Sequence, residues 1–213
     1  MLRQLKIAVA SVLAFTLLFG LAFPLGFTAL ARVLFPHQAG GSLVTRDGHV
    51  VGSALLAQSF TGAGYFHPRP SAAGSGYDAS SSGGTNLGPT SDKVINGIHN
   101  KLPNGQDDPG NFDGIRDLAA AYRSENGLAP GTPLPADAVT RSGSGLDPDI
   151  SPANAQLQIP RVAAARGLLP QLVRELVDAH TQPRQLGFLG EPRVKVLELN
   201  LALDEAGRGA RVR

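Results

Sequence analysis

The stretch Val139 to Ser151, VTRSGSGLDPDIS, holds two Ser-Gly pairs followed closely by Asp-Pro-Asp. Serine hydroxyls beside carboxylates could serve nucleophilic catalysis, and the glycines could present backbone N–H groups to a phosphate. A serine nucleophile also needs a neighbouring base, most often histidine. The histidines stand in five separate sequence contexts, so we predict no catalytic residue: His37, His49, His67, His99 and His180. A serine hydrolase that uses Ser144 remains an alternative hypothesis.

Residue types for other common chemistries are scarce. The chain has no cysteine, which excludes disulfides, thiolate zinc sites and a cysteine nucleophile. The histidines lack the spacing of metal ligands, so we predict no metal site. No G-x-x-x-x-G-K-[ST] motif occurs, which excludes a P-loop, and there is no G-x-S-x-G nucleophile elbow. The short run Ser82, Gly83 and Gly84 could form an anion-binding nest, although such runs more often form turns.

The N-terminal part of the chain is strongly apolar. Ile7 to Ala31 carries no charged residue. As a helix rising about 1.5 Å per residue, this run is long enough to cross a hydrocarbon core of about 30 Å. We therefore predict a transmembrane helix over residues 7–31. A cleaved signal peptide ending at Ala31 would instead give a secreted binding module, but the run is longer than an ordinary signal peptide core.

Charge next to this helix predicts its orientation. Arg3 and Lys6 precede it directly, and a basic flank tends to stay in the cytoplasm. Residues 1–6 are then cytoplasmic and the rest of the chain is extracytoplasmic. The formal net charge of the whole chain is only +2, without a dense basic stripe, so we predict no nucleic-acid partner.

The segment after the helix begins with strand signals and continues in a long irregular stretch. Two β-rich runs flank Asp47-Gly48, which predicts a hairpin over roughly Ser42 to Leu56. Gln58 to Pro89 is rich in Gly, Ser and Pro. We predict an ordered loop there, because a flexible linker would not need these apolar anchors: Phe60, Tyr65, Phe66, Tyr77 and Leu87.

The remaining segment has helical patterns and one apparent strand. Helices are predicted over Asp113 to Asn126, over the stretch that Ser151-Pro152 opens and Gly167 ends, and over Pro170 to His180. Pro160 should kink the second helix or mark a join. Arg193 to Leu203, with alternating leucines, is predicted as a strand. The fold class is therefore α+β, with one transmembrane helix, a single small extracytoplasmic domain of helices and short antiparallel sheets over 32–203, and a flexible basic tail over 204–213.

The order of several sequence blocks resembles a known family. GSALLAQSF, GYFHPRPSA, SGGTNLGP, VTRSGSGLDPDISPANAQLQIPRVAAARG and RVKVLELNLAL follow the membrane helix in the order seen in the C chain of the Kdp-type potassium-transporting ATPase. The likeness extends from the membrane helix to Leu203. Gly88 to Asn111 carries no motif of that family.

The resemblance implies a non-catalytic accessory subunit in the bacterial inner (cytoplasmic) membrane. Its partners would be a potassium-conducting subunit, a P-type ATPase catalytic subunit and a small fourth subunit, together with the lipid bilayer. Members are described as stabilising assembly and as catalytic chaperones that raise the ATP affinity of the catalytic subunit. No cofactor would be firmly bound, and ATP would be met only in a ternary complex.

The resemblance also implies nucleotide-contacting residues. Within QIPRVA, Gln158 is the residue carried over as the nucleotide contact, and Ser82, Gly83 and Gly84 are second candidates. The predicted topology opposes both, because ATP and the nucleotide domain lie in the cytoplasm. An allosteric effect through the membrane helices is the remaining route.

Overall fold

The computed structural model describes residues 1–210, and its chain divides into two compact units. Unit 1 is Met1–Ser53 and unit 2 begins at Ala54. The predicted domain of residues 32–203 therefore includes the hairpin, which belongs to unit 1, and nearly all of unit 2.

Unit 1 begins with one long helix. It consists of α1 (Leu2–Leu17), a π-helical turn η1 (Leu18–Ala22) and α2 (Phe23–Leu34). The whole Leu2–Leu34 stretch has a mean hydropathy of 2.2 in its most apolar window and buries none of that window, so it is long and apolar enough to cross a membrane. The π turn lies just before Pro24, and it spares the proline ring a clash with the preceding turn. The helix therefore continues through Pro24.

A short helix and a hairpin complete unit 1. After α3 (Pro36–Ala39), β1 (Leu43–Arg46) pairs antiparallel with β2 (His49–Ser53). Asp47 and Gly48 both have positive φ, 51° and 78°, as a two-residue hairpin turn requires. The predicted hairpin is confirmed.

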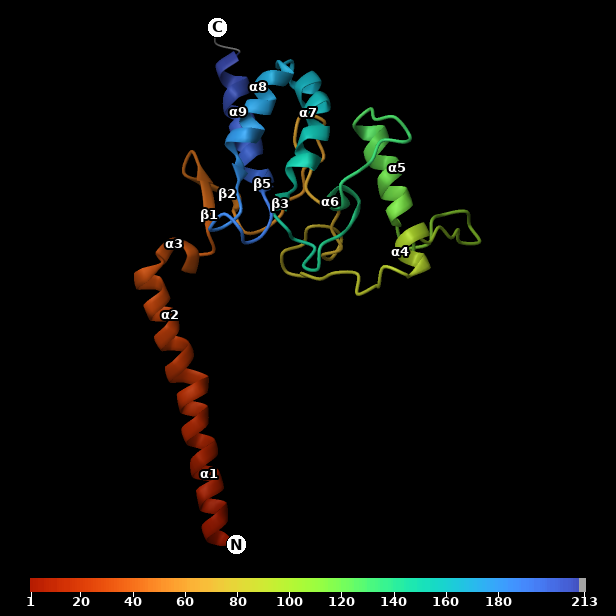
Figure 1. Cartoon of the computed structure of the whole chain (residues 1–213). Helices are drawn as coiled ribbons and strands as arrows, with labels where there is room; N and C mark the ends of the chain where they lie inside the picture. Colours follow the sequence, from red (N-terminus) through yellow and green to blue (C-terminus); the bar gives the residue numbers. More distant parts are fainter. Residues whose placement is uncertain (211–213) are drawn as a thin grey trace. The chain divides into compact units, whose positions relative to one another are not determined.

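Unit 2 contains a small antiparallel sheet beside three helices. The strands β3 (Asp149–Ile150), β4 (Thr181–Gln182) and β5 (Arg193–Lys195) lie in the order β3-β5-β4. In Figure 1 the helices α7 (Pro152–Arg166), α8 (Pro170–Ala179) and α9 (Val196–Ala210) rise from this sheet, with α8 packed against both α7 and α9. The α+β class is therefore confirmed.

Local sequence signals explain where α7 begins and ends. The Ser151 hydroxyl accepts a hydrogen bond from Asn154 N (3.1 Å), Pro152 opens the first turn, and Gly167 ends the helix with φ 64°. The helix is continuous through Pro160, so the join that the sequence allowed there does not occur.

The main core lies between the sheet and these three helices. Val194 on β5 and Leu199 on α9 are fully buried within it, and Phe60, Leu168 and Leu176 pack against its edge. Its buried members are Phe66, Ile150, Ala155, Ile159, Val162, Ala163, Val173, Val177, Val194, Val196, Leu199 and Leu203. Most of them come from the C-terminal half of the chain, with Phe66 inserted from the long loop.

The prediction of a strand over Arg193 to Leu203 is wrong beyond Lys195. Residues from Val196 onward form α9, which buries Val196, Leu197, Leu199, Asn200 and Leu203. Val196, Leu199, Asn200 and Leu203 follow an i, i+3, i+4, i+7 spacing, which is helical. The alternating leucines also fit a strand, but the intermediate exposure of Leu201 shows that they do not share one face. The helix also covers residues 204–210 of the predicted flexible tail, and residues 211–213 lie outside the described part.

A second, smaller hydrophobic cluster involves α5 (Ile115–Glu125) and α6 (Ala136–Val139). The short helix α4 (Asp92–Asn96) lies against α5. The predicted helix around α5 is confirmed, and Tyr122 on it packs with Ala138 and Val139. The Tyr122 hydroxyl donates to Asn154 Oδ1 (2.7 Å), which links this cluster to α7.

Candidate functional site

The loop from Gln58 to Pro89 has no helix or strand, yet many contacts hold it in place. Phe66 is completely buried in the main core, and the Tyr77 hydroxyl donates to Arg69 O (2.8 Å). Leu87 is the exception among the predicted anchors, because it stays exposed. The prediction of an ordered loop is therefore confirmed, although not through every anchor.

Two buried amides bind consecutive residues of this loop. Asn200 Oδ1 accepts from Phe66 N (2.8 Å) and its Nδ2 donates to Phe66 O (2.9 Å). Gln158 repeats the pattern one residue later, with its Oε1 accepting from His67 N (2.8 Å) and its Nε2 donating to His67 O (3.1 Å). Each amide satisfies both backbone groups of one residue, as a neighbouring strand would. We call residues 62–69 the clamped segment.

Gln158 has no polar atom left for a ligand in this arrangement. Its Oε1 also accepts from Arg161 Nη2 (2.7 Å), and its Nε2 also donates to Asn154 Oδ1 (2.9 Å). An amide has two donor and two acceptor positions, and all four are used. The residue is 1% exposed. A nucleotide could reach Gln158 only if the clamped segment moved away.

Two arginines on α7 hold the same segment. Arg161 Nη1 donates hydrogen bonds to Ala63 O (2.7 Å) and Tyr65 O (2.9 Å). These bonds satisfy backbone carbonyls that have no neighbouring strand to bind them. Arg166 donates to Gly64 O and forms an ion pair with Asp204 (2.9 Å). Its guanidinium also lies 4.5 Å from the centre of the Tyr65 ring. Most of the side-chain hydrogen bonds to the clamped segment therefore come from α7, through Gln158, Arg161 and Arg166.

His67 connects the clamped segment to α5. Its Nδ1 lies 2.7 Å from Glu125 Oε1, and its Nε2 lies 3.0 Å from Gly62 O. A carboxylate and a carbonyl can only accept, so the ring makes both hydrogen bonds only when both nitrogens carry hydrogen. The hydrogen bond from His67 lowers the pKa of Glu125 below its ordinary value.

The Ser82–Gly84 run packs against the stretch that contains Ser142 and Ser144. Ser82 Oγ and Gly83 N both donate to Ser144 O (2.9 Å each). A side chain on Gly84 would come within 2.9 Å of Gly143 O. The two glycine-rich segments therefore cross at a distance that side chains would not allow. The candidate nucleotide contacts therefore form two separate groups. Ser82, Gly83 and Gly84 pack against the Ser142–Ser144 stretch, whereas Gln158 binds the clamped segment.

Ser142 and Ser144 lack the neighbouring base that a serine nucleophile needs. Ser144 Oγ accepts from Leu146 N (3.1 Å) and lies 3.4 Å from Ser142 Oγ. Within residues 1–210, neither hydroxyl bonds to a histidine or a carboxylate. This geometry gives no support to the hydrolase alternative, since no base is in place to activate the hydroxyl.

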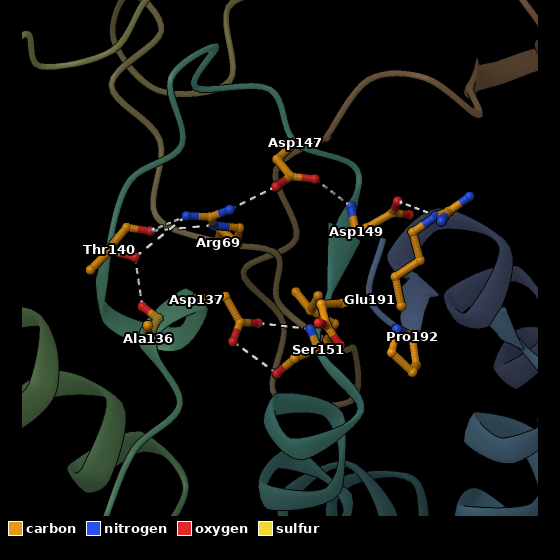
Figure 2. A pocket seen from close by; sticks show the side chains of 11 residues that line it. Arg69, Ala136, Asp137, Thr140, Asp147, Asp149, Ser151, Glu191 and Pro192 are labelled. Carbon is orange, nitrogen blue, oxygen red and sulfur yellow. Dashed lines mark hydrogen bonds and ion pairs between the residues drawn. The ribbon is translucent and has the colours of Figure 1, made fainter. Parts of the chain in front are cut away.

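A charged cavity of about 460 Å³ lies at the sheet end of unit 2 (Figure 2). Arg69 pairs there with Asp147 (2.8 Å), and Arg193 pairs with Asp149 (3.0 Å). Asp137 accepts from Ser151 N and Ser151 Oγ (2.8 Å each), which fixes the start of α7. The carboxylates of this cavity are thus largely occupied by bonds within the protein.

Asp149 is the carboxylate of the cavity whose hydrogen bonding is incomplete. Its Oδ1 is buried without a hydrogen-bond partner among residues 1–210. Burial raises the pKa of this carboxyl, and Arg193 opposes the change. The Asp-Pro-Asp run is visible in the sequence, but its arginine partners are not, because Arg69 and Arg193 lie far away along the chain.

One histidine also lies near carboxylates that the sequence spacing did not reveal. His99, Asp113 and Asp117 bring ligand-type atoms within 4.8 Å of one another. Asp117 Oδ2 already accepts from Gly114 N (2.7 Å) at the start of α5 and lies 3.0 Å from His99 Nε2. These bonds explain the cluster as a helix cap with a neighbouring histidine.

Comparisons with known proteins agree across nearly the whole chain. A family described as "KdpC: K+-transporting ATPase, c chain" matches residues 5–205. A protein of Rhodospirillum rubrum is 52% identical over 206 residues, covering 96% of this chain and 97% of that protein. Proteins of Mycobacterium tuberculosis (strain H37Rv; 49% over 204 residues, 96% and 99% covered) and Caulobacter vibrioides (strain NA1000; 52% over 205 residues, 96% and 94% covered) are similar. All three are named potassium-transporting ATPase KdpC subunit.

Proposed function

The chain belongs to the KdpC family of K+-transporting ATPase c chains, and from this premise we propose that it stabilises the assembled transporter and raises the ATP affinity of its catalytic subunit. It does so as a non-catalytic subunit, while hydrolysis takes place in a P-type ATPase partner. The observation that carries the proposal is the match over residues 5–205, which covers most of the apolar helix and most of unit 2.

We further propose that the chain crosses the bacterial inner membrane once. The Leu2–Leu34 helix exposes a large apolar surface, and contact of this surface with water is unfavourable. A lipid bilayer would remove the surface from water. Arg3 and Lys6 favour a cytoplasmic N-terminus, so unit 2 lies outside the cytoplasm. There it is available to the potassium-conducting subunit and the small fourth subunit.

In this arrangement the effect on ATP is indirect. All four hydrogen-bonding positions of the Gln158 amide are used within the protein. Ser82 Oγ and Gly83 N both donate to Ser144 O, and Gly84 packs closely against Gly143, so much of this second candidate group is also engaged within the protein. The chain would change ATP affinity by favouring one conformation of the assembled transporter, since a bound subunit shifts a conformational equilibrium by its differential affinity.

The test compares the transporter purified with and without this chain. We expect the KM for ATP to rise and the remaining subunits to dissociate more readily when the chain is absent. A photoreactive ATP analogue should label the catalytic subunit alone. An unchanged KM with an intact complex would overturn the proposed role, and labelling of this chain near Ser82 or Gln158 would overturn the indirect route.

A further inference from the structure

The connection between β4 and β5 exposes large apolar side chains at its tip. Leu186 is 83% exposed, Phe188 68% and Leu189 46%. They follow one another within four residues, while the chain on both sides of them is polar or charged. A compact group of exposed apolar side chains commonly marks an interaction site. We call residues 183–192 the apolar finger.

The finger has a fixed shape. Gln185 and Leu189 exchange two backbone hydrogen bonds of 2.9 Å, and Phe188 N donates to Gln185 O (3.2 Å). Arg184 and Glu191 form an ion pair of 2.5 Å across its base. Leu186 has φ 52°, a left-handed backbone conformation that residues other than glycine rarely adopt. The backbone of the finger thus includes an unfavourable conformation at Leu186, while its apolar side chains remain exposed.

The charges around the finger are paired within the chain. Besides the pair at the base of the finger, Arg193 pairs with Asp149 (3.0 Å) and Lys195 with Glu198 (3.0 Å). Arg184, Arg193 and Lys195, the lysine and arginines of residues 183–195, are therefore all paired and are not left over to attract anionic lipid headgroups, which is how many peripheral surfaces bind a membrane. A rigid, electrically balanced tip instead fits a preformed neutral pocket, as the apolar anchors of protein interfaces do.

We propose that the tip of the apolar finger, residues 186–189, docks into a neutral apolar pocket on another protein chain of the same K+-transporting ATPase. This inference rests on the proposed function, because it requires that unit 2 meets a second subunit. It assigns the contact to one short segment and not to the charged cavity beside it, which Glu191 and Pro192 also line. The paired charges at the base of the finger form the polar rim of the interface.

The experiment places a photoreactive benzoylphenylalanine at position 188 of the full chain, co-produced with the other subunits in native membranes. The matched control carries it at Leu169, which is 75% exposed at the start of α8 and outside the finger. We expect light to join position 188 to one transporter subunit, identified by mass, at least tenfold more efficiently than position 169. An adduct of position 188 with lipid or with a second copy of this chain, or no excess over position 169, would overturn the inference.

A second measurement separates this inference from the proposed function. Leu186→Ser with Phe188→Ser should lower recovery of the co-purified complex at least tenfold, while the unfolding temperature of the isolated chain stays unchanged because both side chains are exposed. Leu169→Ser should leave recovery unchanged. If the unaltered chain fails to co-purify at all, the proposed function fails. If the unaltered chain and the double variant co-purify equally, only the role of the finger fails.

Discussion

Gln158 and Asn200 satisfy the backbone of a loop that has no strand beside it. Phe66 reaches the main core only because its N–H and C=O groups, and those of His67, find partners inside the protein. A buried backbone group without a partner costs about 1 to 3 kcal/mol. The glutamine of the QIPRVA sequence is thus explained by the stability of unit 2, without a nucleotide.

Replacing that glutamine tests this explanation. Gln158→Leu should lower the free energy of unfolding by about 3 kcal/mol, because it leaves the backbone groups of His67 and one donor of Arg161 unpaired. Gln156→Leu, on the same helix but only partly buried, should cost under about 1 kcal/mol. The measurement is urea unfolding of the full chain in detergent, followed by circular dichroism. A stable Gln158→Leu variant that only weakens ATP binding in the complex would speak for a direct contact instead.

The pair of His67 and Glu125 should make stability depend on pH. The pKa of Glu125 is lowered in the folded state, so its contribution is present at neutral pH and is lost as the pH falls through that lowered value. In Glu125→Gln the deficit against the unaltered chain should therefore be largest near pH 7 and shrink toward pH 3. Unfolding temperatures across this range check the prediction, with Glu175→Gln on the exposed side of α8 as control. A deficit that is constant with pH would contradict it.

At the scale of the elements, local sequence signals predict a helix or strand correctly wherever they are compatible with one structure only. Asp47-Gly48 predicted the hairpin, and Ser151, Pro152 and Gly167 predicted both ends of α7. The C-terminal strand was mispredicted because leucines at every second position are compatible with two periods. Tertiary packing decides between them: Asn200 binds the backbone of Phe66 and is buried together with its neighbour Leu199, whereas a strand would point these two side chains to opposite faces.

The candidate site was less predictable than the fold. Its contacts join residues that are far apart in sequence, such as Arg69 with Asp147 and His67 with Glu125. No spacing rule covers such pairs. The Ser-Gly runs were visible in the sequence, but their role as a backbone crossing follows only from the distance between the two segments.

The crossing of the two glycine-rich segments gives a matched pair of substitutions. Gly145 has φ 67°, and an added Cβ would lie 2.7 Å from Ala73 N and Gly83 O, whereas a Cβ on Gly143 would meet nothing within 4 Å. Gly145→Ala should therefore destabilise the chain by about 3 kcal/mol, and Gly143→Ala by under about 1 kcal/mol. Urea unfolding of both variants provides the measurement. Equal stabilities would show that the segments do not cross as closely as described.

At the scale of the whole molecule, the chain combines an apolar helix with a unit that has its own core. The Leu2–Leu34 helix is long and apolar enough to cross a membrane, and none of its most apolar window is buried. The core of unit 2, in contrast, is closed by its own helices and sheet. The central claim is therefore that unit 2 acts from outside the cytoplasm and that its effect on ATP crosses the membrane through other subunits.

The topology of the chain tests this claim most directly. The chain has no cysteine, so single cysteines at Gln4 and at Gln171, both exposed, can be probed with a membrane-impermeant thiol reagent on intact cells, with permeabilised cells as control. Position 171 suits this purpose because, unlike position 158, it is accessible without unfolding. We predict that only position 171 is labelled in intact cells and that both positions are labelled after permeabilisation. Labelling of position 4 alone in intact cells would put unit 2 in the cytoplasm and contradict the account.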